Sequence, residues 1–358
     1  MRVRRLVFNI HLYVALVAAA FVTVLGLTGS IMAFEPELFR LTHRSLTFVT
    51  PADHALPLAD VQAAAERAFP GEHALSLTVP RDAGESYQVS LEKRAAYVNQ
   101  YTGAVLGDRP AGMDWLGWVH QAHLRLAVMN RAFPGKEIVT WGAAGMLVLL
   151  LSGLYLWWPL KRVRIRWDGA ARRSWFDVHN AIGICAYAFL LVLTLTGLSI
   201  GLEGTTTSLY YSLTGSEPSK PPRADIVAPD GATRLPIDSV ARIAAAAIPG
   251  AAPFLIVYPR AKGPYEVRSR FPEDRTPGGR SRVLVHPYSG TVLFAEGSRT
   301  APAGARIVVT NRAIHTGDLY GLPTKLLMSF ASLMAVAQVL SGLAMWRLRI
   351  RRREPAPS

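Results

Sequence analysis

Two histidines occupy the same position in two long uncharged stretches of the chain. The first pattern is His11, then Leu27-Thr28-Gly29, then Glu35, and the second, with identical spacing, is His179, then Leu195-Thr196-Gly197, then Glu203. Each histidine is separated from its glutamate by 23 residues without Asp, Glu, Lys or Arg. At about 1.5 Å per residue, such a helix crosses a hydrocarbon core of about 30 Å. Each histidine is therefore expected at the same end of a membrane helix, where an ionisable residue is a functional candidate.

A pair of such histidines has a specific chemical use. If the two helices face each other, two imidazole nitrogens meet across one gap, which is what the axial positions of a six-coordinate b-type haem require. The spacing therefore predicts that His11 and His179 hold the iron of one haem. The competing interpretation is two interfacial histidines that hydrogen-bond to backbone or lipid. Four glycines near these positions would let a macrocycle or a neighbouring helix approach closely, namely Gly26, Gly29, Gly183 and Gly197.

Three further histidines lie near the other ends of the spans. His120 and His123 belong to the apolar segment Trp115–Met129 before the second span, and His315 lies in the matching place before the fourth. The i, i+3 spacing puts His120 and His123 on nearly one helix face, so only one of them can pair with His315 across a second haem. A leucine four residues later, present after both His120 and His315, favours His120. A zinc site made by His120 and His123 is the weaker alternative, because no carboxylate or Cys stands at matching spacing.

Two haems near opposite faces would form an electron path across a layer of about 30 Å. Haem carries two propionate carboxylates, and arginine is the usual partner of a carboxylate. Five arginines at the helix ends are candidates, namely Arg5, Arg172 and Arg173 at one end and Arg125 and Arg312 at the other. The alternative roles are membrane topology for the first set and solvated surface for the second.

Four uncharged stretches of spanning length set the predicted architecture. The predicted spans cover residues 6–34, 138–160, 177–202 and 326–346, and the uncharged run of the third begins at Val178, after Asp177. The rest of the chain divides into a short loop at 161–176, a tail at 347–358 and two long connections at 35–137 and 203–325. The first apolar run is about twice as long as the core of a usual signal peptide, so an uncleaved anchor is expected.

The net charge of +14 is concentrated beside the helix ends. The segment before the first span, the short loop and the tail together hold 14 Lys and Arg, against Asp168, Glu354 and, at the start of the third span, Asp177. The two long connections carry the other 25 Lys and Arg against 22 Asp and Glu. A basic excess in short segments is the positive-inside signal. Both termini are therefore expected in the cytoplasm and both long connections outside, with membrane lipid and no nucleic acid as partners.

Each long connection predicts a small α+β domain, and the two connections match. In the first, Leu56-Pro57 begins an alanine-rich helix that Pro70-Gly71 ends, and strand-like runs follow. The same dipeptides recur 179 residues later as Leu235-Pro236 and Pro249-Gly250. The second and fourth spans also share Leu-Ser-Gly-Leu and a later tryptophan. Because each half crosses the membrane twice, the prediction is an internal parallel duplication.

These motifs resemble the PepSY-associated transmembrane family over nearly the whole chain. The resemblance rests on the His…Leu-Thr-Gly and Leu-Ser-Gly…Trp spans and on the Pro-Gly/Tyr-x-Gly domain between them. That family includes haem-containing inner-membrane reductases of ferric siderophores, the FoxB type. The resemblance implies a bacterial inner-membrane protein with four transmembrane helices and two periplasmic PepSY-like domains. The family's His-x-x-Leu pattern matches at His123, so His120 and His123 both stay open as the partner of His315.

The expected function is a di-haem b oxidoreductase that reduces a ferric siderophore in the periplasm and releases Fe(II) for iron uptake. Hard oxygen chelators hold iron(III) strongly and iron(II) much less so, and one-electron reduction would release the iron without breaking the ligand. No nucleotide-binding motif is found in the sequence, so the donor would be quinol or a cytoplasmic flavin reductase in trans. Two other classes stay open: a PepSY-type regulatory or scaffold protein, and a siderophore permease. Four spans without charged residues offer a permease little for a polar path.

Overall fold

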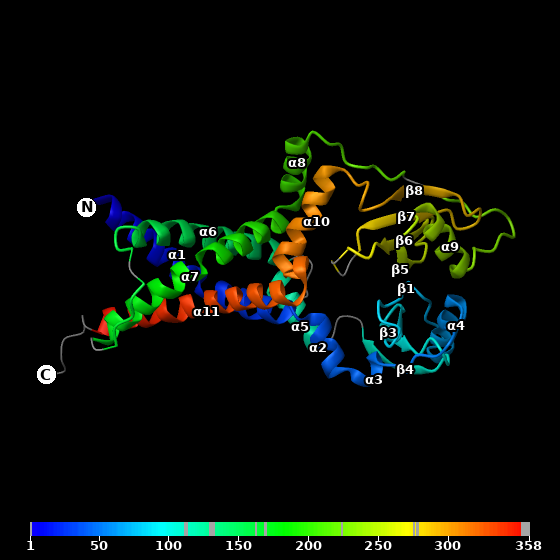
Figure 1. The fold of residues 1–358 in the computed structure, drawn as a ribbon, viewed down its shortest axis with the longest axis horizontal. Coiled ribbons are helices and arrows are strands. Elements are labelled where there is room, and N and C mark those ends of the chain that lie inside the picture. Colours follow the sequence, from blue (N-terminus) through cyan, green and yellow to red (C-terminus); the bar gives the residue numbers. More distant parts are fainter. Residues whose placement is uncertain are drawn as a thin grey trace. The chain divides into compact units, whose positions relative to one another are not determined.

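The computed structural model describes residues 2–110, 114–128, 133–161, 163–167, 170–222, 225–274, 276 and 279–351. The chain folds as two compact units (Figure 1). The helical unit consists of Met1–Glu35, Trp115–Ser208 and Thr310–Ser358, and the sheet unit consists of Pro36–Asp114 and Leu209–Val309.

Four helices of the helical unit are long and apolar enough to cross a membrane, as the sequence predicts. They are α1 (Arg2–Met32), α6 (Gly135–Trp157), α7 (Ala171–Gly201) and α11 (Leu322–Arg351). Both α1 and α7 pack against α6 and against α11, so the four helices form a closed bundle (Figure 1). The Arg2 end of α1 and the Arg351 end of α11 lie together, and Arg349 stands 5.5 Å from the ring centre of Phe8.

The helices extend beyond the uncharged runs from which they were predicted. Helix α7 begins at Ala171 and therefore carries Arg172 and Arg173 on its first turn. Arginine is a good helix former, and a helix can continue from the hydrocarbon layer into the charged interface. The basic residues next to the spans are thus fixed to the same rigid elements as the histidines.

Two ion pairs, one partly buried and one buried, secure segments beside the bundle helices. Asp177 of α7 accepts hydrogen bonds from Nε and Nη2 of Arg166 at 2.8 and 3.0 Å, which ties the preceding loop to the helix. Lys325 of α11 lies 3.5 Å from Asp318, and both side chains are buried. Asp177 is the first residue of the predicted span 177–202, and Lys325 directly precedes the predicted span 326–346. Both stand near helix ends and both are paired, because burial of an unpaired charge is costly.

Short helices complete the helical unit and connect it to the rest of the chain. Within the helical unit lie α5 (Trp115–Arg125), which packs against α1 and α6, and the 3-10 turn η1 (Asp318–Tyr320). Helix α10 (Ala303–Thr316) ends in the helical unit, and α8 (Glu203–Thr214) begins there. The first long connection opens with α2 (Glu35–Thr42) and α3 (Arg44–Thr47).

The sheet unit contains one antiparallel sheet of eight strands in the order β4-β3-β2-β1-β5-β6-β7-β8. The strands are β1 (Ser76–Thr78), β2 (Tyr87–Ser90), β3 (Arg94–Val98), β4 (Val105–Pro110), β5 (Ala252–Val257), β6 (Tyr265–Arg270), β7 (Ser281–Val285) and β8 (Val292–Glu296). Strands β1 and β5 pair with Leu77 opposite Ile256. The two small domains expected from the sequence therefore share one sheet, because pairing of β1 with β5 satisfies two strand edges that would otherwise be open.

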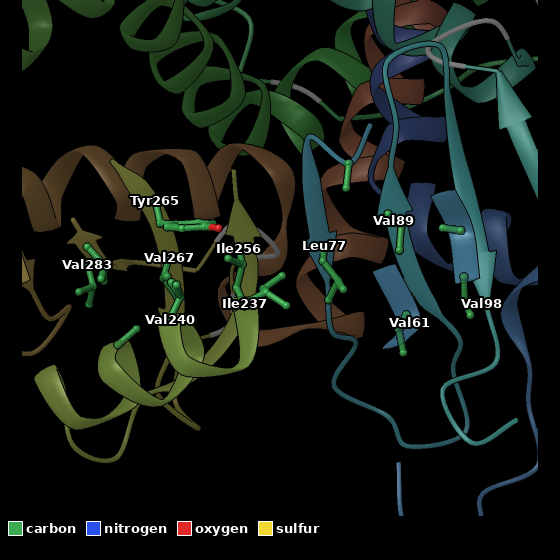
Figure 2. Close-up of a cluster of buried hydrophobic side chains, with 14 of the residues drawn as sticks. Val61, Leu77, Val89, Val98, Ile237, Val240, Ile256, Tyr265, Val267 and Val283 are labelled. Carbon is green, nitrogen blue, oxygen red and sulfur yellow. The ribbon is translucent and has the colours of Figure 1, made fainter. Parts of the chain in front are cut away.

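One hydrophobic core holds this sheet to its two helices, α4 (Leu58–Ala68) and α9 (Ile237–Ala247). Figure 2 shows Val61 of α4 and Val240 of α9 among side chains from strands of both halves. The carboxylate of Asp238 in α9 also accepts hydrogen bonds from the backbone N–H groups of Leu58 and Ala59, at 2.8 and 3.0 Å. Asp238 thereby supplies acceptors to the unsatisfied first turn of α4.

Candidate functional site

His11 of α1 and His179 of α7 lie together inside the helical bundle. Their ring centroids are 6.4 Å apart and the ring planes are nearly perpendicular, at 88°. The Oγ of Ser152 in α6 lies 2.8 Å from Nδ1 of His11. The Oγ of Ser341 in α11 lies 2.9 Å from Nδ1 of His179. Four helices therefore build the α1–α7 pair. Helices α1 and α7 carry the two imidazoles, and α6 and α11 each carry a hydroxyl that contacts one imidazole.

His123 of α5 and His315 of α10 form a second pair. Their ring centroids are 6.3 Å apart, with the planes at 51°. The hydroxyl of Thr28 in α1 lies 3.0 Å from Nδ1 of His123, and the hydroxyl of Thr196 in α7 lies 3.0 Å from Nδ1 of His315. In this α5–α10 pair, α1 and α7 supply the hydroxyls and the short helices supply the histidines.

His120 lies outside the second pair, although the sequence did not decide between His120 and His123 as the partner of His315. Its Nδ1 is 3.1 Å from Oε2 of Glu35, and the side chains of His120 and Glu35 are 40% and 35% exposed. The structure therefore brings His123, and not His120, to His315.

Burial controls the charge of the α5–α10 pair, whose helices are separate from the four membrane-length helices. Burial is the main cause that lowers the pKa of His123 to about 4, and the nearby His315 and His120 add to it. Burial also lowers the pKa of His315 to about 4. Both imidazoles are therefore uncharged at neutral pH, the form in which histidine binds metals.

A glycine follows each of the four hydroxyl residues and lies against the histidine ring. A Cβ atom would stand 3.0 Å from Cε1 of His123 at Gly29 and 3.1 Å from Cε1 of His315 at Gly197. The corresponding distances to the α1–α7 pair are longer, 3.4 Å at Gly153 and 3.6 Å at Gly342. We call each hydroxyl residue with its following glycine a histidine seat. The four seats are Thr28-Gly29, Thr196-Gly197, Ser152-Gly153 and Ser341-Gly342.

The two other glycines singled out in the sequence serve helix contact. A Cβ at Gly26 would stand 2.8 Å from the backbone oxygen of Ser332 in α11. A Cβ at Gly183 would stand 2.9 Å from Nε2 of Gln338. That glutamine donates to the backbone oxygen of His179 at 2.8 Å, so Gly183 leaves room for a side chain that holds the histidine's own turn of helix.

An apolar cavity of about 820 Å³ adjoins the α1–α7 pair, and both histidines line it. Its walls come from α1, α6, α7 and α11, with aliphatic and aromatic side chains over most of the lining. Five arginines also line it, namely Arg4, Arg5, Arg172, Arg173 and Arg349. The cavity therefore combines an apolar body with a strongly basic part.

Arg5, Arg172 and Arg173 were expected at this site from the sequence, and Arg4 and Arg349 were not. Spacing would have found both. Arg4 precedes His11 by seven residues and Arg349 follows Gly342 by seven, which is two helical turns and so the same helix face.

The two arginines expected near the α5–α10 pair lie on the same short helices as its histidines. Arg125 is the last residue of α5, two residues after His123. Arg312 is exposed on α10, three residues before His315, and its positive charge contributes to the lowered pKa of His315 after burial.

The hydroxyl partners of the histidines were not predicted. The Leu-Thr-Gly and Leu-Ser-Gly motifs were visible in the sequence, yet each hydroxyl contacts a histidine on another helix. Motif spacing along one helix carries no information about which neighbouring helix faces it. Among the residues that the structure describes, no group of three or more His, Cys, Asp or Glu is arranged to hold a metal ion.

Comparison with known proteins gives one match. The family model of the PepSY-associated TM region matches residues 8–349, which include both histidine pairs and all four seats. No curated protein matches the chain.

Proposed function

We propose that this chain, which belongs to the PepSY-associated transmembrane family, is a di-haem b oxidoreductase of the bacterial inner membrane. It would pass electrons outward and reduce a ferric siderophore in the periplasm. The α1–α7 pair would ligate one haem and the α5–α10 pair the other. The observation that carries the proposal is the geometry of these two pairs.

The separation of the rings fits one metal atom between them. With a metal–nitrogen bond of about 2.0 Å, as for zinc, and a ring centroid about 1.1 Å from each ring atom, two opposed imidazoles have centroids about 6.3 Å apart. The observed values are 6.4 and 6.3 Å. Both pairs therefore have the ring separation that two axial imidazoles of one metal atom require.

The nitrogens that remain free also fit. A seat hydroxyl occupies Nδ1 of every paired histidine, so Nε2 is the ring nitrogen left to bind a metal. A protein zinc site needs three or four ligands, and the described residues gather only two at each pair. Haem needs only two from the protein, because its porphyrin supplies the other four.

The size and the lining of the cavity beside the α1–α7 pair fit haem. Its volume of about 820 Å³ falls in the range of roughly 300–1,000 Å³ typical of ligand and cofactor pockets. The apolar walls would receive the porphyrin, and Arg5, Arg172 and Arg173 would pair with the propionates, together with Arg4 and Arg349. By position, Arg125 and Arg312 remain the candidates for the propionates of the second haem.

The two pairs are spaced for transfer across a membrane. His11 and Thr28 are 17 residues apart in α1, and so are His179 and Thr196 in α7, which is about 25 Å along each helix. The pairs therefore lie near opposite ends of an apolar bundle that would fill a layer of about 30 Å. Bound haem supplies reversible one-electron transfer, while the protein holds the two sites at fixed depths.

Charge and internal symmetry support the orientation and the origin of this arrangement. We infer that the basic end of the bundle, with Arg2 and Arg351, faces the cytoplasm and that the sheet unit is periplasmic. We also infer an internal parallel duplication, because the strand order is symmetric about the β1–β5 pair and the four seats recur in two sets.

The donor would be quinol or a cytoplasmic flavin reductase, and one electron would convert Fe(III)-siderophore into Fe(II) and free siderophore.

Haem content and substrate reduction test this function. The purified chain is expected to contain two b-type haems, seen as a Soret band and as pyridine haemochrome, both reducible by dithionite. Anaerobic addition of a ferric hydroxamate to the reduced protein should reoxidise the haem and yield Fe(II), trapped by a chromogenic Fe(II) chelator.

The gallium complex of the same hydroxamate is the matched control, because Ga(III) has the same charge and similar size but does not accept an electron. It should leave the haem reduced. A chain without haem, even after haem supplementation during expression, would refute the oxidoreductase and favour a scaffold role. Haem that is present but not reoxidised by ferric hydroxamates would refute this substrate class.

A further inference from the structure

The four seat hydroxyls share a second contact, to a backbone carbonyl, that bears on the direction of the hydrogen bond with the histidine. Each donates to the backbone carbonyl four residues earlier in its own helix. The distances to these carbonyl oxygens are 2.6 Å from Ser152 to Val148, 2.8 Å from Ser341 to Ala337, 2.6 Å from Thr28 to Val24 and 2.7 Å from Thr196 to Val192. A hydroxyl has one hydrogen, so in this arrangement it can only accept the hydrogen bond from the histidine.

The consequence is a defined tautomer at all four histidines. If the hydroxyl accepts, Nδ1 must carry the ring proton, and Nε2 then holds a lone pair. We propose that Ser152, Ser341, Thr28 and Thr196 are positioning residues that keep the four histidines in this metal-ready tautomer and set the reduction potentials of the two haems. The inference rests on the proposed function and assigns roles that the histidines alone do not explain.

Other hydroxyls of the same helices show that the histidine contact is a separate feature. Thr23 of α1 and Thr194 of α7 also donate to the carbonyl four residues earlier, at 2.8 and 2.7 Å. Bonding of this kind is common for threonine in helices. Neither Thr23 nor Thr194 lines the cavity, and the contacts found for their hydroxyls are to backbone. They are therefore matched controls for the seats.

The glycines complete the seats, because they let a ring lie close enough for its Nδ1 to reach the hydroxyl. Gly29→Ala and Gly197→Ala would place a methyl group 3.0 and 3.1 Å from a ring carbon, which forces the ring away by a few tenths of an ångström. Gly153→Ala and Gly342→Ala would make ordinary contacts at 3.4 and 3.6 Å.

We therefore expect Gly29→Ala and Gly197→Ala to alter the potential or the retention of the α5–α10 haem. Gly153→Ala and Gly342→Ala are expected to alter the α1–α7 haem less, because their methyl groups would make only ordinary contacts with the histidine rings. Optical redox titration and haem stoichiometry measure this. Equal effects of all four variants would show that the ring contacts do not govern the sites.

The hydroxyl variants test the proposal directly. Ser152→Ala and Ser341→Ala should change only the haem of the α1–α7 pair, and Thr28→Val and Thr196→Val only that of the α5–α10 pair. Loss of the Nδ1–H hydrogen bond makes the imidazole a weaker base, which disfavours Fe(III) and raises the reduction potential. Each variant should also lose its haem about 10- to 100-fold faster to apomyoglobin, the usual cost of removing such a partner.

Conservative variants separate positioning from folding. Thr28→Ser and Ser152→Thr keep the hydroxyl and should retain wild-type potentials, and Thr23→Val and Thr194→Val should do the same. Nitrogen-15 NMR of the haem-free, histidine-labelled chain gives a readout that needs no cofactor: the wild type should show the Nδ1–H tautomer, and Ser152→Ala should lose one such signal.

The outcomes distinguish the two proposals. If wild type binds two haems but the hydroxyl variants keep wild-type potentials, haem retention and tautomers, the positioning role is overturned and the proposed function stands. If the wild-type chain shows the Nε2–H tautomer at the paired histidines, the positioning role is overturned as well. A wild-type chain that shows the Nδ1–H tautomer but takes up no haem would overturn the proposed function, and with it the control of haem potentials.

Discussion

His11→Ala and His179→Ala are each expected to remove the same haem and to leave the other in place. The two imidazoles stand 6.4 Å apart on different helices, so either one alone leaves a haem with a single protein ligand. The haem content should fall from two to about one per chain in each variant, and the double variant should lose no more than either single one. Pyridine haemochrome on the purified protein measures the content, and low-temperature α-band spectra identify which haem is lost.

Electron transfer to ferric hydroxamate provides the second readout of these variants. The remaining haem of the α5–α10 pair should still be reoxidised by the substrate when dithionite is the donor, because it lies at the proposed periplasmic side. Transfer from a quinol or cytoplasmic donor should be abolished. Ser216→Ala, a substitution in the sheet unit at a residue of neither pair and no seat, serves as a control for handling of the membrane protein. Loss of different haems in His11→Ala and His179→Ala would disprove the pairing.

His123→Ala is expected to remove the other haem, whereas His120→Ala should keep both. His123 stands 6.3 Å from His315 and is held by Thr28, while the Nδ1 of His120 is directed to Glu35. His315→Ala should reproduce the spectrum of His123→Ala. The substrate reaction should be lost in His123→Ala and His315→Ala, since the haem nearest the proposed periplasmic side would be missing.

His120→Ala is the matched control for His123→Ala, because both histidines lie on the short helix α5 and both substitutions remove an imidazole. Haem content, α-band spectra and Fe(II) production should separate them. Loss of the haem in His120→Ala with retention in His123→Ala would reverse the assignment and would show that α5 is rotated in the haem-bound protein.

Residue types and their spacing along the chain were enough for several features. Four membrane-length helices followed from runs without charge, because a helix in lipid must be apolar along its whole length. The helix positions of His11 and His179 followed from the two copies of one pattern, and the family followed from the motifs themselves. Arg5, Arg172 and Arg173 were expected near these histidines because they lie on the same helices one or two turns away.

Contacts between different helices could not be obtained in this way. His120 and His123 differ by about 60° around their helix axis, since α-helices have 3.6 residues per turn, and only the rotation of α5 against its neighbours decides which one meets His315. The same limit applies to the sheet unit, where each half looked like a closed domain until β1 and β5 were seen to pair.

The histidine seats show this division most clearly. By itself, the sequence determined which residue types recur and at what spacing along a helix, because those properties depend only on residue type and on distance along one helix. Only the tertiary structure decided that Ser152, Ser341, Thr28 and Thr196 each hold a histidine of another helix. The reason is physical: a hydrogen bond between helices depends on their relative rotation and depth, which packing of the whole bundle sets and which no local pattern encodes.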